Sequence, residues 1–557
     1  MNAHKSRWPA WTPFLLVVLG PAPVQAEDVV PEGDVVMEAM VDELNRSMDL
    51  RLEDLQKPYF IQYRSDDGTI HRLSASYGAL TASQDNRRRS FASRVRVGDY
   101  DLDNTNFAGG SRGGRRAVLP VDDDYVAIRQ AIWAATDRDY KAAVEALTRK
   151  QAYLENKSIE DRPNDFTRTD PVVHLAPLAE LDFDKQAWIE RVKRISARFQ
   201  AYPAIQDSQV SLIAAASTNY TVNSEGTRLR VSDTGVLLEI SADLQADDGM
   251  RLADQRTFGG YALDELPAVD ELLTAVDTLC SSLVETAAAP ILEEYTGPVL
   301  FNGKAAPQMF ASLLARGLAG QPDPVGVARR HSDDSLDKKL GKRILPRSFQ
   351  VYDDPTLKRW GTEILFGWYE YDDEAVPARR VDLVVDGVLE TQVMSRTPTK
   401  KLVGTTGHGR AARLGSDARA AVANLFICCD QGLSDEELKA RLIEACQDED
   451  LEFGLRITSM QGVGWGGLAD PIHAYKVYVA DGREERVRGI EFQPVEIRSL
   501  RRILAAGKTQ SVYNYLSGVS AAVVAPAVLM EEIELTKIEQ EFDKLPILKS
   551  PATRQPS

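Results

Sequence analysis

The side chains that could do chemistry in this sequence are few and scattered. Beyond residue 26 the chain holds five histidines, and no two of them lie three to five residues apart, so none forms the paired ligands of a helical metal site. His408 stands between two glycines, where it could hydrogen-bond a bound peptide or orient a loop. Asp372 and Asp373 could supply paired carboxylates for acid–base work, although acidic loop residues are usually solvated. His408, Asp372 and Asp373 are therefore the weak catalytic candidates of this sequence.

One glycine-rich stretch has the spacing of a nucleotide-binding motif without its context. Gly462, Gly464 and Gly467 match the dinucleotide fingerprint, which needs a helix directly after the glycines. Asp470-Pro471 and an alternating strand pattern follow instead, so we expect a loop between two strands. The G-x-S-x-G nucleophile elbow is absent from the sequence.

The stretch from Tyr295 to Gly320 is the element around which the rest of the chain is organised. It predicts a strand at Pro298 to Phe301, a turn at Asn302-Gly303, and an amphipathic helix that ends at glycines. The apolar residues of this helix recur at helical spacing: Met309, Phe310, Leu313, Leu314 and Leu318.

This stretch resembles the core of the TldD/PmbA (TldD/TldE) family of metallopeptidase-related proteins. Ala305-Ala306 match the approach to the helix that carries the zinc motif HExxxH in the metal-binding members. The resemblance extends from about Pro58 to Leu535 and is strongest in four runs: Val95 to Phe107, Asn223 to Gly226, Met394 to Pro398, and Gly407 to Arg410.

The resemblance implies an α+β fold, with an N-terminal mixed α/β domain or domains followed by a strand-rich C-terminal domain and a cleft between the parts. We expect these boundaries: a signal peptide at 1–26, an N-terminal domain at 27–165, a central α+β region at 166–290, a C-terminal domain at 291–540, and a disordered tail at 541–557.

The positions that match the zinc motif have lost its chemistry. They hold Ala311 and Ser312 in place of the first histidine and the glutamate, and Arg316 in place of the second histidine. Zinc needs neutral imidazole or anionic ligands and a base beside its water, whereas alanine has no lone pair and arginine is itself a cation. The cysteine that completes the site near the C-terminal end of metal-binding relatives is also missing from SGVSAAVVAPAV. We therefore predict no metal and no other cofactor.

Three functions are compatible with this pattern. In the first, the protein is a metal-free, non-catalytic homologue that binds peptide or pairs with a metal-bearing peptidase subunit, as homodimer or heterodimer. In the second, it is an active metallopeptidase whose metal site is rebuilt from groups such as His408, Asp372 and Asp373. In the third, it is a structural or assembly protein of the cell envelope.

The N-terminus and the overall charge bound the location and the partners. Residues 1–26 combine two cations, a short apolar core and a small-x-small site at Ala26, which predicts cleavage there and export to the periplasm or the exterior. No later segment has the length of a membrane span. The net charge of −17 disfavours nucleic acid as a partner.

Several local patterns predict features that coordinates can check. Asp66 to Gly68 predicts a hairpin turn, and Arg87 to Arg89 a solvated turn between strands. Asp122 to Asp124 should cap a helix, and Val519 to Met530 should be a buried strand. The cysteines favour packing over bridging, although a disulfide that involves Cys280 or Cys446 remains open; all four are Cys280, Cys428, Cys429 and Cys446.

Overall fold

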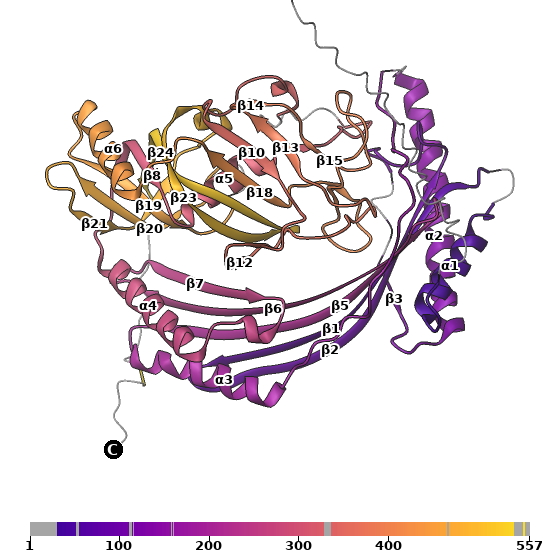
Figure 1. Cartoon of the computed structure of the whole chain (residues 1–557), viewed down its shortest axis with the longest axis horizontal. Helices are drawn as coiled ribbons and strands as arrows, with labels where there is room; N and C mark the ends of the chain where they lie inside the picture. Colours follow the sequence, from indigo (N-terminus) through magenta and orange to yellow (C-terminus); the bar gives the residue numbers. More distant parts are fainter. Residues whose placement is uncertain are drawn as a thin grey trace, which may run out of the picture.

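A computed structural model describes residues 30–51, 55–110, 114, 116–157, 159, 161–327, 336–464, 467–539 and 550–551. The expected signal peptide, His331 and nearly all of the expected tail lie outside these described residues. Within them, strands from the first half of the chain form a sheet of seven, and strands from the second half form a sheet of eleven (Figure 1). The α+β fold with a strand-rich C-terminal domain is thereby confirmed.

The first sheet is a long, curved layer beneath the C-terminal half of the molecule in Figure 1. Its order is β3-β2-β1-β5-β6-β4, with β7 along the later part of β6. All of its pairings are antiparallel except that of β4 with β6. Its strands are β1 (Pro58–Ser76), β2 (Ala79–Val97), β3 (Ala117–Leu119), β4 (Val173–Leu175), β5 (Asp207–Asn223), β6 (Arg228–Gln245) and β7 (Arg251–Gly260).

Helices cover the first sheet at its two ends (Figure 1). At one end α1 and α2 share a core with β1, β2 and β5, and at the other α3 and α4 pack on β5 and β6. Each helix buries an apolar face at helical spacing, which is the main source of its stability in water. These helices are α1 (Val35–Ser47), α2 (Tyr125–Lys157), α3 (Lys185–Ala197) and α4 (Val269–Ala288), with short 3₁₀ turns at Arg198–Ala201 and Leu263–Glu265.

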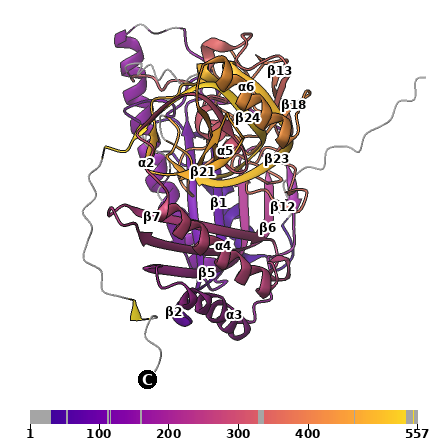
Figure 2. The same ribbon diagram turned by 90° about the vertical axis from the view of Figure 1, so that its left-hand side faces the viewer.

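The second sheet curls around the short helix α5 (Ala305–Phe310), all of whose residues are buried (Figure 2). Its order is β14-β13-β10-β18-β24-β8-β19-β20-β21, and β22 and β23 also pair with β24. Its strands are β8 (Glu294–Phe301), β10 (Phe349–Asp353), β13 (Val381–Val385), β14 (Val388–Leu389), β18 (Asn424–Cys429), β19 (Phe453–Met460), β20 (Pro471–Tyr478), β21 (Glu484–Val487), β22 (Ile490–Phe492), β23 (Ile503–Ser517) and β24 (Val519–Lys537).

Smaller elements fill the loops of the C-terminal half. The helix α6 (Asp435–Asp448) begins at a capping box formed by Ser434 and Glu437 and packs outside the second sheet. The two-residue strands are β9 (Ala319–Gly320), β11 (Arg359–Trp360), β12 (Glu363–Ile364), β15 (Val393–Met394), β16 (Gly409–Arg410) and β17 (Arg419–Ala420); 3₁₀ turns occupy Asp337–Lys339 and Ile497–Arg502.

Two predicted turns are wrong, and both lie inside the β1–β2 hairpin. Asp66 to Gly68 continues β1, and the chain reverses at Tyr77-Gly78, where both φ angles are positive (47° and 88°). Arg87 to Arg89 lies within β2 rather than in a turn. Because β1 has hydrogen-bonded neighbours on both sides, the pairing overrides the local turn preference of the Asp-Asp-Gly sequence.

Other local predictions are confirmed. Asn223 to Gly226 joins β5 to β6, and Asp124 caps α2 by accepting a hydrogen bond from the backbone N–H of Ala127 (2.8 Å). Val519 to Met530 lies within β24. The four cysteines are free, with Cys280 and Cys446 buried.

Strands from the expected N-terminal domain (27–165) and from the expected central region (166–290) hydrogen-bond within one sheet. Among the described residues, no helix combines the length and the apolar composition needed to cross a membrane.

Candidate functional site

The segment that matches the zinc motif follows α5 as a single turn of π-helix, Ala311–Ala315. Ala311 is buried in the main core of the C-terminal half, and Arg316 is exposed beyond the turn. The Ser312 hydroxyl donates to the carbonyl of Gln308 (2.9 Å) and accepts from the backbone N–H of Gly464 (3.0 Å). The segment is thus packed and hydrogen-bonded as ordinary structure.

Neighbouring groups secure the same turn. The Gln308 side-chain amide donates to the carbonyl of Met460 (2.9 Å), and its oxygen accepts from the Met460 backbone N–H (2.9 Å). Both groups are buried, so this pair fixes α5 against the end of β19.

The residues present do not fit a zinc ion. Ala311 offers no donor atom, and the Ser312 hydroxyl already has a hydrogen-bond acceptor and a donor. In the region 517–528, where the resemblance implies a cysteine ligand in metal-binding relatives, the residues Ala521 to Ala525 of β24 are apolar and buried. Across the described ranges, no three His, Cys, Asp or Glu side chains gather closely enough to hold a metal ion.

His408 is fully buried rather than presented on an exposed turn. Its Nε2 lies 3.0 Å from the Oδ1 of Asp353, which is also fully buried. Its Nδ1 lies within 3.0 Å of the carbonyl and the hydroxyl of Thr406. The other Asp353 oxygen accepts from the backbone N–H of Ala423 (2.9 Å). Since both ring nitrogens are engaged, His408 orients the surrounding loops.

Asp372 lies beside this histidine loop, and backbone amides satisfy its carboxylate. One oxygen accepts from the N–H groups of Glu374 and Val376, and the other from Gly409 (2.7–2.9 Å). Burial, followed by the charge of the buried neighbour Glu374, raises the pKa of Asp372 to about 8. Burial also raises the pKa of Glu374, although nearby Arg396 opposes this. Asp372 and Glu374 thus lie in one buried region, where a negative charge on Glu374 makes ionisation of Asp372 less favourable.

Asp373 joins the two halves of the molecule. Its carboxylate pairs with Arg64 of β1 (2.8 Å) and accepts from the backbone N–H of Ala411 (2.6 Å). Its carbonyl accepts from the side-chain amide of Gln62 (3.0 Å). The structure therefore brings His408, Asp372 and Asp373 onto adjoining loops, where hydrogen bonds and ion pairs occupy each of them.

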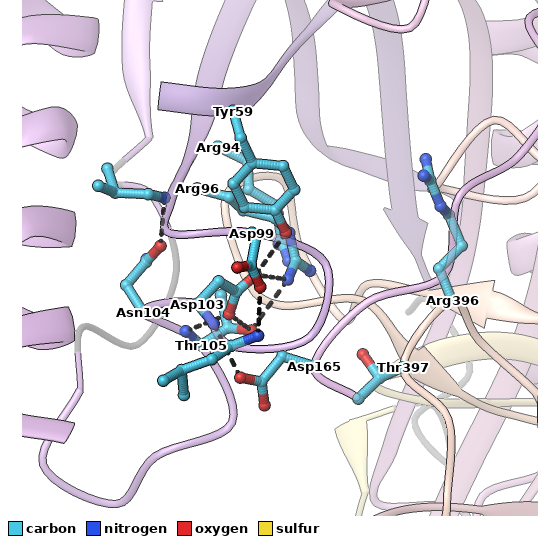
Figure 3. A network of polar contacts seen from close by, with 12 residues as sticks. Tyr59, Arg94, Arg96, Asp99, Asp103, Asn104, Thr105, Asp165, Arg396 and Thr397 are labelled. Atoms are coloured by element: carbon cyan, nitrogen blue, oxygen red, sulfur yellow. Dashed lines mark hydrogen bonds and ion pairs between the residues drawn. The ribbon is translucent and has the colours of Figure 1, made fainter. Parts of the chain in front are cut away.

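The structure also contains a larger buried ionic network, which the sequence analysis did not predict (Figure 3). Arg96 pairs with Asp103 (2.6 Å), and the hydroxyl of Tyr59 donates to the same carboxylate oxygen (2.7 Å). Lys150 pairs with Asp165 (2.5 Å), which also accepts from the Asp103 backbone N–H (2.9 Å). Burial is the largest influence on Asp103 and opposes its charge, but the charge of Arg96 and the hydrogen bonds from Thr105 and Arg96 together lower the pKa of this carboxyl.

Arg396 connects this region to the C-terminal half. Its guanidinium carbon lies 3.9 Å from the ring centroid of Phe166 and 5.1 Å from that of Phe60. It pairs with Glu225 (2.7 Å) and donates to the carbonyl of Thr167 (2.9 Å). A signal for these residues existed in the sequence, because Arg96, Asp103, Glu225 and Arg396 all lie in the runs that carry the family resemblance.

Comparisons with known proteins relate the chain to a family of metallopeptidase-like proteins. Residues 294–537 match the PmbA/TldA metallopeptidase C-terminal domain. A metalloprotease of Methanothermobacter thermautotrophicus is 25% identical over 228 residues, which cover 40% of this chain and 46% of that protein. A metalloprotease of Archaeoglobus fulgidus is 31% identical over 141 residues, 25% of this chain and 28% of that protein. The match thus spans less than half the length of either curated relative.

Solved structures match over most of the chain. The structure of TldE from Thermococcus kodakarensis has a TM-score of 0.58 at 12% identity and covers 90% of this chain and 100% of that one. A putative modulator of DNA gyrase from Thermotoga maritima has a TM-score of 0.57 at 15% identity, with 86% and 96% covered. Identities this low show the fold alone. The solved structures thus share the fold, and the C-terminal domain match and the related metalloproteases identify this chain as a member of the TldD/PmbA family.

Proposed function

We propose that this protein is a metal-free, non-catalytic member of its family that pairs with a metal-bearing peptidase subunit and helps to hold its peptide substrate. The proposal is supported above all by the π-helical turn at Ala311–Ala315. Where metal-binding relatives need three ligands and a base, this chain has a core alanine, a serine bonded to backbone and an exposed arginine.

The test of this function measures metal content and partnership in parallel. Purified chain is incubated with zinc chloride, dialysed and analysed by inductively coupled plasma mass spectrometry; we expect far less than one zinc per chain. Co-expression with a family chain from the same organism that keeps HExxxH should yield a stoichiometric complex whose peptidase activity needs the metal-bearing chain. Stoichiometric zinc together with peptidase activity in the isolated chain would refute the proposal.

Restoring the motif alone should not restore the site. In the variant Ala311→His, Ser312→Glu, Arg316→His, we expect zinc to bind no more tightly than in wild type, because the third ligand from β24 is still missing. Competition with a chromogenic chelator measures the affinity. Since a histidine at the buried position 311 risks overpacking the core, the pair Ser312→Glu, Arg316→His is measured beside it as a better-folded control. An affinity like that of natural zinc peptidases would contradict the prediction.

We further propose that the chain acts outside the cytoplasm after removal of residues 1–26. The charged start, apolar core and Ala26 site support this. N-terminal sequencing of protein recovered from the envelope or the medium should begin at Glu27. Recovery of the intact chain from the cytoplasm alone would contradict export.

A further inference from the structure

A polar cavity of about 730 Å³ lies where α4 and β7 meet the strands β19, β20 and β21 of the C-terminal half, on the left of Figure 1. The turn Gly303-Lys304, directly before α5, forms part of its wall. The cavity lies apart from His408 and from the ionic network of Figure 3, and the proposed function does not use it.

The lining of this cavity is suited to a polar ligand. Two aromatic rings, those of Tyr475 and His473, belong to the described lining of the cavity. Aliphatic side chains are absent from this described lining. Hydroxyl groups and charges make up the rest: Thr278, Ser281, Ser282, Thr458, Ser459, Arg256, Lys304, Arg486, Asp277 and Glu285. Hydroxyl groups and cations around one concavity are the donors that recognise oxyanions.

The acidic residues of the lining already have partners. Asp277 binds Arg198 through two contacts (2.6 and 2.9 Å), and the guanidinium of Arg486 lies 3.1 Å from Glu285. Just outside the lining, Asp254 lies 3.0 Å from the Nε2 of His473. Each of these carboxylates therefore already has a closer partner than Arg256 or Lys304.

Two cations of the lining lack a close counter-ion. The carboxylate oxygen nearest to the guanidinium of Arg256 belongs to Asp254 and is 3.9 Å away. The ammonium group of Lys304 has no hydrogen bond or ion pair within the described part of the chain, although its side chain is exposed toward the cavity. Lys304 thus faces the cavity with an uncompensated charge.

The surroundings of Lys304 make that charge unfavourable in the empty protein. Partial desolvation by the surrounding protein, followed by repulsion from Arg256, lowers the pKa of the ammonium group. Asp254 and Glu363 act in the opposite direction without cancelling the shift. An anion between Lys304 and Arg256 would relieve both the repulsion and the loss of hydration.

We propose that this cavity is a binding site for an oxyanion, a phosphate or carboxylate group held between Arg256 and Lys304, with hydroxyl groups of α4 and β19 completing its hydrogen bonds. The chemistry suits a small phosphorylated or carboxylated molecule and the free carboxyl end of a short peptide. The site uses neither a metal nor a partner subunit, so it stands or falls separately from the proposed function.

Isothermal titration calorimetry on the full chain tests the site with three probes: inorganic phosphate, a short peptide with a free C-terminal carboxylate, and the same peptide amidated at its C-terminus. We expect phosphate or the free peptide to bind, and the amidated peptide to bind at least about tenfold more weakly than its free twin, the size of one charged hydrogen bond. Binding of phosphate alone assigns the site to phosphorylated molecules, and binding of the free peptide alone assigns it to peptide ends.

Variants tie the binding to the two cations. Lys304→Gln and Arg256→Gln should each weaken the probe that binds by about tenfold. The control is Arg251→Gln, because Arg251 is an exposed arginine on the same strand, five positions from Arg256 and on the opposite face, outside the cavity. Circular dichroism and thermal unfolding check that each variant is folded.

Two results would overturn the inference: no binding of either anion to the folded wild type, or unchanged binding in the folded double variant Lys304→Gln, Arg256→Gln. The zinc and partner measurements respond to neither variant, so a failure here is distinguishable from a failure of the proposed function.

Discussion

His408 shows how much a single side chain contributes when its partner is buried with it. Replacing His408 with Ala leaves the Asp353 carboxylate fully buried without its imidazole partner. We expect the free energy of unfolding to fall by about 3 kcal/mol, measured by chemical denaturation. The half-buried His71, which pairs with the exposed Asp85, is the control, and His71→Ala should cost less than about 1 kcal/mol.

The same variant separates a structural from a metal-binding histidine. Because both ring nitrogens of His408 already have partners, His408→Ala should leave the zinc content of the protein unchanged. Tightly bound zinc in the wild type that disappears in this variant would show that the histidine is a metal ligand.

The buried carboxyl pair should make stability depend on pH. Because the folded pKa of Asp372, about 8, exceeds its ordinary value of 3.8, the folded state holds a proton that the unfolded state has lost. The stabilisation is complete below about pH 4 and is lost as the pH rises toward 8. Glu374→Gln removes the charge that repels the Asp372 carboxylate. The free energy of unfolding of the variant, relative to that of wild type, should therefore increase by about 1 kcal/mol from pH 5 to pH 8. Denaturation curves at both pH values measure this.

An exposed glutamate provides the comparison for that experiment. Glu390 is exposed and directly follows β14. The difference in the free energy of unfolding between Glu390→Gln and wild type should be the same at the two pH values. If the difference in the free energy of unfolding between Glu374→Gln and wild type is also the same at the two pH values, the two buried carboxyl groups do not repel each other.

At the scale of elements, the strand β2 places the side chain of Arg89 in the interior and that of the neighbouring Arg88 in solvent. Arg89 is 2% exposed and pairs with Asp67 (2.7 Å) and Asp123 (2.8 Å), whereas its neighbour Arg88 is exposed. We expect Arg89→Ala to lower the free energy of unfolding by about 3 kcal/mol, because Asp67 loses its buried partner. Arg88→Ala should change it by less than about 0.5 kcal/mol. Equal effects in the two variants would contradict the role of the strand.

Local sequence patterns predicted the elements with strong periodicity and missed those fixed by distant pairing. The apolar run of β24 was sufficient because Val519 to Met530 is buried almost throughout. Asp66 to Gly68 carries turn chemistry, yet it lies between β2 and β5, and neither neighbour can be inferred from the tripeptide itself. The absence of the zinc motif could be read directly, because it depends on residue type alone at Ala311, Ser312 and Arg316.

The sequence pointed to His408 but not to its buried contacts, because those contacts come from distant segments of the chain. Glycine on both sides drew attention to His408, but its burial against Asp353 depends on β10, more than fifty residues earlier in the chain. The ionic network of Figure 3 joins segments that no sequence spacing relates.

At the scale of the whole molecule, Arg396 is a central link between the N-terminal sheet and the C-terminal half. Arg396→Ala removes the partner of Glu225 and the contact with Phe166. We expect a loss of about 3 kcal/mol in the free energy of unfolding and faster limited proteolysis, because the two parts hold each other less firmly. Arg380→Ala, a half-exposed arginine paired with Asp382, is the control. Proteolysis at the wild-type rate would show that other contacts suffice to join the parts.

The pairing of β1 with β5 also constrains how the chain is made. Gln62 lies opposite Asn223, so one edge of β1 stays open while the ribosome synthesises everything between them. A nascent chain halted before Asp207 exposes a long unpaired edge, the kind of surface that recruits chaperones or aggregates. Because Val210 pairs with Ala75 and Asn223 pairs with Gln62, the synthesis of β5 is the stage of translation at which this edge of β1 can close.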